Sequence, residues 1–341
     1  MKKFDFTAVT GHDAICAKLR HSVKAQQMVN AYLFAGPDGI GKKTVANAFA
    51  SALLCENPRE GNPCMQCGSC RLFSADSHPD LIRLQTPGDR KTIGVELVRE
   101  QVIKEAYVRP FSAKRKVFII ENGELMTDEA QNALLKVLEE PPAYTIFLVL
   151  ATAKGQLLET ICSRCVKMEL LPLPTAQCDA FFQEQPHHDT ERKKLAGSLA
   201  QGNIGRGLRI LKDDNYYSLY KETIENVSMF FKHPNAITNI QMFFAEKRDY
   251  IDYVIDFMLF FLRDSLRFAM NEHAPLICTD SHSIIADCSH ILTSKHSIAI
   301  MEAAIHFRDR LQKNAGFTIA GLEFLTRIQE EIYDESNRRS F

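Results

Sequence analysis

The stretch that decides the fold lies between residues 30 and 44 and reads NAYLFAGPDGIGKKT. Its first part, residues 31–35, is a short apolar run of the kind that forms a buried strand. The turn that follows contains three glycines in six residues, and a helical pattern extends over residues 42–54. A strand, a glycine-rich turn and a helix in this order form a phosphate-binding corner of an α/β domain.

The same alternation continues through the first half of the chain. Strand patterns recur at residues 80–84, 116–120, 145–151 and 166–170, and helical patterns at residues 94–106 and 128–138. This alternation predicts a parallel sheet with helices on both faces, because right-handed crossovers place the connecting helices there. The fold class that we expect for residues 1–170 is therefore α/β.

After about residue 170 the strand signals fade and helical patterns dominate. The sequence LPLP at residues 171–174 marks a linker, and a small helical unit follows it. The last part of the chain mixes apolar and polar residues at helical spacing. We therefore expect three domains, at residues 1–170, 171–210 and 211–341.

The composition excludes two classes of protein. With 41 Lys and Arg against 42 Asp and Glu the formal net charge is -1, so bulk charge cannot drive nucleic-acid binding. The most apolar long stretch, residues 250–270, contains five charged residues, whereas a membrane span needs about 20 nearly uncharged ones. The N-terminus lacks an apolar segment followed by a cleavage site, so we expect a cytoplasmic protein without membrane contact.

Four cysteines form the most specific local pattern. Cys55, Cys64, Cys67 and Cys70 have the spacing C-x8-C-x2-C-x2-C. Two-residue spacings let neighbouring thiolates point at one ion, and four thiolates complete the tetrahedral shell of a structural zinc. The alternatives are four reduced thiols or disulfides, and a cytoplasmic location disfavours disulfides. We predict a closed, non-catalytic Zn2+ site in a module at residues 55–70.

The glycine-rich turn matches the phosphate-binding pattern G-x4-G-K-[ST] except at its last position. Gly36, Gly41 and Lys42 fit, but Lys43 stands where the pattern has the hydroxyl that holds magnesium. Thr44 comes one residue late, and one step along a helix turns a side chain by about 100°. Nucleotide binding through these glycines, Lys42 and Thr44 therefore competes with a second interpretation, in which the loop is an inherited fold element and ATP binding is doubtful.

The strand at residues 116–120 is followed by Glu121 and Asn122. In an ATPase this strand ends in Asp-Glu, where the aspartate organises magnesium and the glutamate activates water. An amide cannot act as a general base, so the sequence predicts little or no ATP hydrolysis at this site.

One arginine, Arg164, lies between small residues in the run TICSRC at residues 160–165. An arginine at the boundary of an element is usually a surface charge. Beside a sheet, however, Arg164 can project its planar guanidinium into the phosphate site of a neighbouring subunit.

Together these motifs resemble those of the bacterial clamp-loader subunits of DNA polymerase III, which belong to the AAA+ family. The resemblance rests on residues 30–34, the altered phosphate loop, the four cysteines, TDEAQNALLKVLEEPP at residues 127–142, and SRC at residues 163–165. The motifs follow the family's order from residue 30 to about residue 207. The last two are highly specific in combination.

The resemblance implies an AAA+ P-loop NTPase-like domain with an inserted zinc module, a helical lid and an all-helical collar that joins five subunits in a ring. It implies that Arg164 is an arginine finger, which acts in trans on ATP held by an adjacent ATPase subunit. It also places Arg206 at the lid position that senses phosphate in ATP-binding members. Without a bound nucleotide, Arg206 is a structural residue.

The sequence leaves more than one function open. In the first interpretation the chain is a non-catalytic subunit that works with the delta and tau/gamma subunits to load the sliding clamp onto primed DNA during replication. In the second it is an ATP-hydrolysing motor of the tau/gamma type, whose site uses Thr44 and Glu121. A weaker third is an AAA+ scaffold unrelated to replication. The residues at positions 43, 121 and 122 favour the first.

Overall fold

The structure is a computed structural model that describes residues 4–86, 92–152, 157–186, 189–313 and 315–336. The chain divides into two units. The first consists of Met1–Cys178 with Gly202–Gly205, and the second of Asp179–Gln201 with Arg206–Phe341. The three-domain division expected from the sequence stays a prediction.

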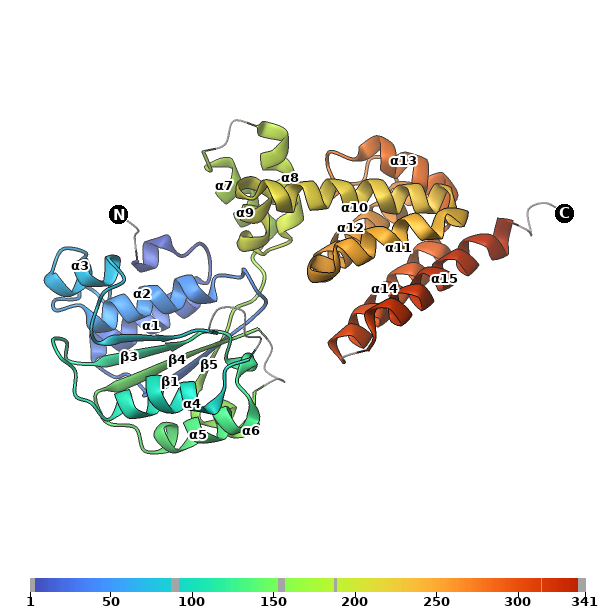
Figure 1. The fold of residues 1–341 in the computed structure, drawn as a ribbon. Helices are drawn as coiled ribbons and strands as arrows, with labels where there is room; N and C mark the ends of the chain where they lie inside the picture. The colour runs from blue at the N-terminus through green and yellow to red at the C-terminus, as the bar shows by residue number, and fades with distance from the viewer. Residues whose placement is uncertain (1–3, 87–91, 153–156, 187–188, 314, 337–341) are drawn as a thin grey trace. The chain divides into compact units, whose positions relative to one another are not determined.

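A five-stranded parallel sheet forms the centre of the first unit (Figure 1). In chain order its strands are β1 (Ala31–Ala35), β2 (Leu81–Leu84), β3 (Lys116–Ile120), β4 (Thr145–Ala151) and β5 (Val166–Glu169). They lie side by side in the order β2-β3-β4-β1-β5. β1 is therefore central, and the loop after it lies at the carboxyl edge of the sheet, where open α/β sheets bind their ligands.

Helices cover both faces of the sheet, which confirms the α/β prediction (Figure 1). One face carries α1 (Asp13–Ala25) and α2 (Lys42–Leu54), and the other carries α4 (Val95–Val98), α5 (Asp128–Glu139) and α6 (Glu159–Arg164). The strand alternation explains this division, since successive side chains point to opposite faces. Phe34 belongs to the core beneath α1 and α2, whereas Leu33 belongs to the core that includes Leu134 of α5.

Two connections in the first unit add local structure. α3 (Gly68–Ser74) follows α2 through the segment that contains the four cysteines. The helix predicted at residues 94–106 is present, but after α4 it widens into a π-helical turn at Arg99–Lys104. A hydrophobic pattern does not distinguish an α-helix from a π-helical turn here, because both bury the same side of the helix, through Val98 and Val102.

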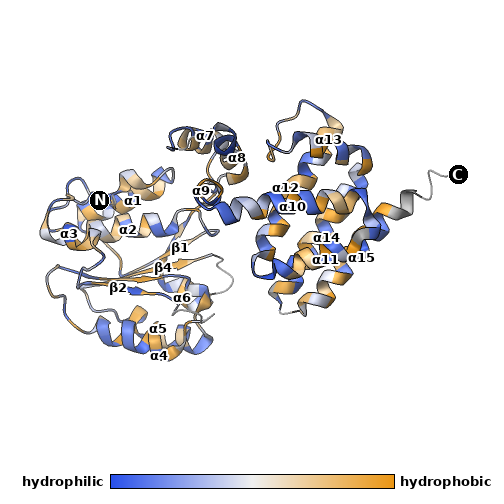
Figure 2. Ribbon diagram, turned by 45° about the horizontal axis from the view of Figure 1, so that its top comes forward, coloured by the Kyte–Doolittle hydropathy of each residue, from blue (hydrophilic) through white to orange (hydrophobic). Residues whose placement is uncertain are grey.

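After β5 the described residues form helices and connections only. The helices are α7 (Thr175–Gln183), α8 (Thr190–Ala200), α9 (Ile204–Lys212), α10 (Asp214–Lys232), α11 (Ile237–Glu246), α12 (Ile251–Met270), α13 (His282–Ile291), α14 (Ser294–Gln312) and α15 (Phe317–Ser336). Figure 2 shows apolar and hydrophilic residues interleaved along the helices from α10 onward. Stacked rings of Phe244, Phe307 and Phe324 join α11, α14 and α15. Among the described residues, no helix combines the length and the apolar character needed to cross a bilayer.

A buried carboxylate fixes the loop that leads into β3. Asp80, whose exposed fraction is 1%, accepts hydrogen bonds from the backbone N–H groups of Phe111 (2.5 Å), Ser112 (2.8 Å) and Ala113 (2.7 Å). Burial alone would raise the pKa of Asp80, but these N–H groups outweigh burial and lower it below its ordinary value. The ionised carboxylate therefore holds residues 111–113 in one conformation.

We expect Asp80→Asn to lower the free energy of unfolding by about 1–3 kcal/mol at neutral pH, because an amide is a weaker acceptor for three N–H groups. The folded-state pKa of Asp80 is depressed, so its contribution is present above the ordinary value of 3.8 and is lost as the pH falls through the folded pKa. Urea unfolding of both proteins between pH 3 and pH 8 measures this. Equal stability at pH 7, or a difference that grows below about pH 4, would contradict it.

Candidate functional site

The phosphate loop lies between β1 and α2 and keeps the backbone shape of a phosphate cradle. Gly41, directly before α2, has a φ of +108°, a region that side chains strongly disfavour. The buried ammonium of Lys42 donates to the carbonyl oxygens of Gly36 (2.6 Å) and Pro37 (3.0 Å). Burial lowers the pKa of Lys42. This lysine thus bonds its own loop instead of extending away from it.

Three further donors hold the tip of the loop. The His12 ring lies 3.0 Å from the carbonyl oxygen of Ile40, and the Asn203 amide donates to that of Asp38 (2.6 Å). The backbone N–H of Gly205 donates to the carbonyl oxygen of Gly39 (3.0 Å). A Cβ at position 205 would lie 2.5 Å from the Gly39 Cα, so only glycine permits this approach. The five carbonyls of residues 36–40 therefore all have protein donors.

An ion pair occupies the position where the motif would place a metal. The Lys43 ammonium lies 2.8 Å from Oε2 of Glu121, the residue that follows β3. Oε1 of Glu121 accepts a hydrogen bond from Gln85 (3.0 Å) and lies 4.0 Å from the Arg83 guanidinium. Glu121 is buried, and two cations of the protein, Lys43 and Arg83, lie beside its carboxylate. They balance its charge.

A cavity of about 350 Å³ opens between the loop and the end of β3. Its lining includes Gly41, Lys42, Thr44 and both residues that follow β3. Thr44 is exposed at the start of α2, and Asn122 takes the place of a general base. The structure thus brings the predicted phosphate-loop residues together. It adds the ammonium of Lys43, whose side chain is 60% exposed, in an ion pair with Glu121 beside the metal position.

Arg164 is the last residue of the short helix α6. Its guanidinium donates to the Thr160 carbonyl oxygen (2.9 Å) and forms an ion pair with Glu139 at the end of α5. A third of the side chain is exposed, at 33%. The guanidinium is therefore oriented by two contacts and still reaches the surface.

Arg206 belongs to the second unit, where it forms an ion pair with Asp256 of α12 (3.2 Å). Its guanidinium also lies 5.3 Å from the centre of the Phe260 ring. Arg308 of α14 donates to the same aspartate (2.6 Å). These contacts are those of a structural ion-pair network between helices, and a phosphate-sensing role stays a prediction.

The four predicted cysteine ligands converge at the end of α2. Their sulfur atoms all lie within 4.8 Å of one another, and those of Cys55 and Cys67 are 4.0 Å apart. A tetrahedral ion with metal–sulfur bonds of 2.3 Å places its ligand atoms about 3.8 Å apart, so the donor set fits one ion. The cluster can therefore hold a metal ion.

Backbone N–H groups surround these sulfurs as they do in metal sites. The N–H of Cys64 donates to the Cys55 sulfur (3.2 Å), and the N–H of Cys70 to that of Cys67 (3.4 Å). Burial raises the pKa of Cys55 to about 11. For Cys64, burial acts in the same direction, but N–H groups of Gln66 and Cys67 outweigh it and lower the pKa to about 7.

Sequence reasoning missed the residues that support this site. No local motif pairs Lys43 with Glu121, which lies 78 residues away. The donors His12 and Asn203 also act across long separations, and neither belongs to a local motif. One signal was available, because a lysine at the hydroxyl position and a glutamate after β3 are charge-complementary changes in one site.

Two family models match the chain. The model described as "DNA polymerase III, delta subunit" matches residues 11–174, and "DNA polymerase III, delta subunit, C terminal" matches residues 214–330. DNA polymerase III subunit delta' of Pseudomonas aeruginosa is 41% identical over 174 residues, which are 51% of this chain and 52% of that protein. Subunit tau/gamma of Haemophilus influenzae is 34% identical over 211 residues, which are 60% of this chain and 30% of that protein.

The match therefore spans about half of the first relative and less than a third of the second. Subunit delta' of H. influenzae is 32% identical over 318 residues, which cover 89% of this chain and 92% of that protein. Because that similarity extends over nearly the full length of both proteins, the chain belongs to the family of DNA polymerase III delta' subunits.

Proposed function

We propose that the chain is a non-catalytic subunit of a bacterial clamp loader, and that it completes the ATP site of a neighbouring subunit with Arg164. The observation that carries the proposal is the ion pair between Lys43 and Glu121. In an active site, a magnesium ion between the phosphates and the end of β3 neutralises the transferring group. Here the ammonium of Lys43 already has that carboxylate, so a metal would meet a cation instead of a ligand.

The tau/gamma-type motor is the weaker alternative for the same reason. It requires Thr44 to hold magnesium and Glu121 to act on water or metal. Glu121 is instead engaged by Lys43 and Gln85, and no carboxylate stands at position 122. We therefore propose that Gly36, Gly41, Lys42 and Thr44 retain the shape of a nucleotide site without serving ATP hydrolysis, and that Arg206 is structural.

The orientation and the exposure of the Arg164 side chain support its proposed role in trans. A finger stabilises the charge that develops on a transferring phosphoryl group, which requires an oriented guanidinium at the subunit surface. The Thr160 carbonyl and Glu139 orient that group, and a third of the side chain is exposed. The partners that we propose are the delta and tau/gamma subunits, and through the assembled complex the sliding clamp and primed DNA, in the cytoplasm.

We further propose that the cysteine cluster binds Zn2+. Four thiolates at tetrahedral spacing are the ligand set of a structural zinc, and a closed shell of this kind leaves no position for a reacting water. When bound, zinc would supply cross-linking between the end of α2 and the start of α3. Cys55 is the residue after α2, and Cys67 precedes α3.

We expect the purified chain to contain about one equivalent of zinc, and Cys64→Ser with Cys67→Ser to remove it and lower the melting temperature. Plasma emission spectrometry measures the metal, and thermal unfolding measures the stability. Cys178→Ser, which changes a buried cysteine elsewhere, is the control and should keep the zinc. Less than about half an equivalent in gently handled wild-type protein would contradict the assignment.

We expect the isolated chain to bind Mg·ATP weakly and not to hydrolyse it. Lys43→Ser removes the cation that pairs with Glu121 and restores a hydroxyl at the motif position, so it should tighten Mg·ATP binding by about tenfold or more. Lys43→Arg preserves the ion pair and is the matched control. Calorimetric titration measures the affinities. Turnover by the wild-type chain that Lys42→Ala abolishes would favour the motor instead.

We expect Arg164→Ala to slow ATP hydrolysis at the neighbouring site by about 10³–10⁵-fold in a complex reconstituted with delta and tau/gamma subunits. The total ATPase rate of the complex should fall by the fraction that this one site contributes. Arg99→Ala, which changes an exposed arginine of the same unit, should leave the rate unchanged. Gel filtration would show that both variants assemble. An assembled Arg164→Ala complex with the wild-type ATPase rate would contradict the proposed role of Arg164 as an arginine finger.

A further inference from the structure

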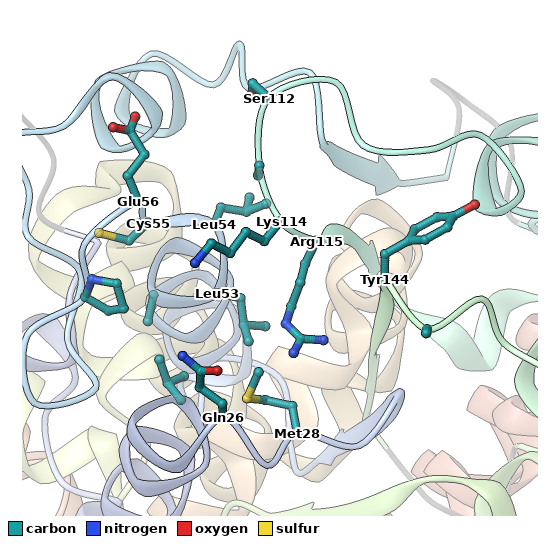
Figure 3. A pocket seen from close by; sticks show the side chains of 15 residues that line it. Gln26, Met28, Leu53, Leu54, Cys55, Glu56, Ser112, Lys114, Arg115 and Tyr144 are labelled. Carbon is teal, nitrogen blue, oxygen red and sulfur yellow. The ribbon is translucent and has the colours of Figure 1, made fainter.

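A second cavity, of about 460 Å³, lies beside the cysteine module (Figure 3). Met28, Arg115 and Tyr144, which precede β1, β3 and β4, are among its lining residues. The cavity therefore lies at the amino edge of the sheet, whereas the phosphate loop lies at the carboxyl edge. Five residues of strand, at about 3.3 Å each, separate the two edges by about 17 Å. The cavity is not part of the nucleotide site.

Most of the cavity wall is apolar. It is formed by the carboxyl-terminal ends of α1 and α2 and by the loops before β3 and β4. The apolar side chains that line it are those of Val23, Met28, Ala52, Leu53, Leu54, Pro58, Ala113 and Ala143. A wall of this composition favours an apolar side chain as occupant, because such a group leaves water on entering.

Two cations project across this apolar wall. Figure 3 shows the side chains of Lys114 and Arg115 extending over the middle of the cavity. Neither forms an ion pair with any residue that the structure describes. The Asp80 carboxylate holds residues 111–113, so the backbone that positions both cations is fixed. Glu56, the carboxylate in the lining, accepts a hydrogen bond from the Ser69 N–H (3.0 Å).

An exposed apolar side chain directly precedes the cavity lining in the sequence. Phe111, one residue before the lining residue Ser112, has an exposed fraction of 87%. A small-molecule site encloses most of its ligand, whereas exposed apolar residues around an open cavity are typical of a surface that contacts another macromolecule.

We propose that this surface, made of the cavity, Lys114, Arg115 and Phe111, binds an acidic segment of a partner protein that inserts an apolar side chain into the cavity. Charge complementarity selects the partner, because two unpaired cations attract carboxylates on either side of the inserted group. Single-stranded nucleic acid is the competing occupant, because Phe111 offers an exposed aromatic face on which a base can stack. The apolar wall beneath the two cations favours an apolar side chain instead. The proposal does not depend on the role of Arg164.

The test uses the full chain and a fluorescein-labelled peptide of sequence DDDLFDD, with KKKLFKK and DDDAADD as controls. Fluorescence anisotropy should give saturable binding of the first peptide only, weakened by salt. Lys114→Glu with Arg115→Glu should weaken it by about tenfold or more, and Ala143→Trp, which fills the cavity from an exposed position, should do the same. Lys295→Glu, an exposed lysine of α14, should change nothing.

Other outcomes would overturn the proposal. These are the absence of saturable binding, equal binding of the peptide with lysines, or equal affinity in all variants. An oligothymidylate that binds instead of the peptide, and is lost with the same charge changes, would assign the surface to nucleic acid. If the charge variant melts below the wild type, Ala143→Trp and the peptide controls decide the question.

Discussion

The ion pair between Lys43 and Glu121 is the interaction on which the functional account depends. It joins the first turn of α2 to the end of β3, the two elements between which a phosphate site would hold its metal. A buried carboxylate without a cation would be costly, and in a metal-binding site magnesium supplies that charge. Here Lys43 of the same chain supplies that positive charge. The Lys43 ammonium balances the Glu121 carboxylate within the protein, and we propose that the corner keeps the fold of a phosphate site without its chemistry.

The rest of the corner shows how the shape survives that change. His12, Asn203 and Gly205 hold three successive carbonyls of the loop, and Lys42 holds the two before them. None of these contacts requires a nucleotide. The loop therefore stays folded as part of the protein's own structure, and it also holds Asn203 and Gly205 in place.

Local patterns were enough to predict the architecture but not the contacts that carry function. The largely apolar runs at residues 31–35, 116–120 and 145–151 match β1, β3 and β4, because central parallel strands are buried on both faces and therefore contain few polar residues. The cysteine cluster was likewise visible, since its ligands are close in sequence. The partners of Lys43, and the cavity under Arg115, arise only when distant segments meet, so no local pattern records them.

We propose that Arg164 contacts ATP held by a neighbouring subunit, whereas this chain's own phosphate loop binds ATP weakly and does not hydrolyse it. The most direct measurement is photo-crosslinking of the assembled complex with an ATP analogue that bears an arylazide on its γ-phosphate, followed by peptide mapping. We expect label on this chain to map to residues 159–165, around Arg164. Label on residues 36–44 of the phosphate loop, with none near Arg164, would contradict it.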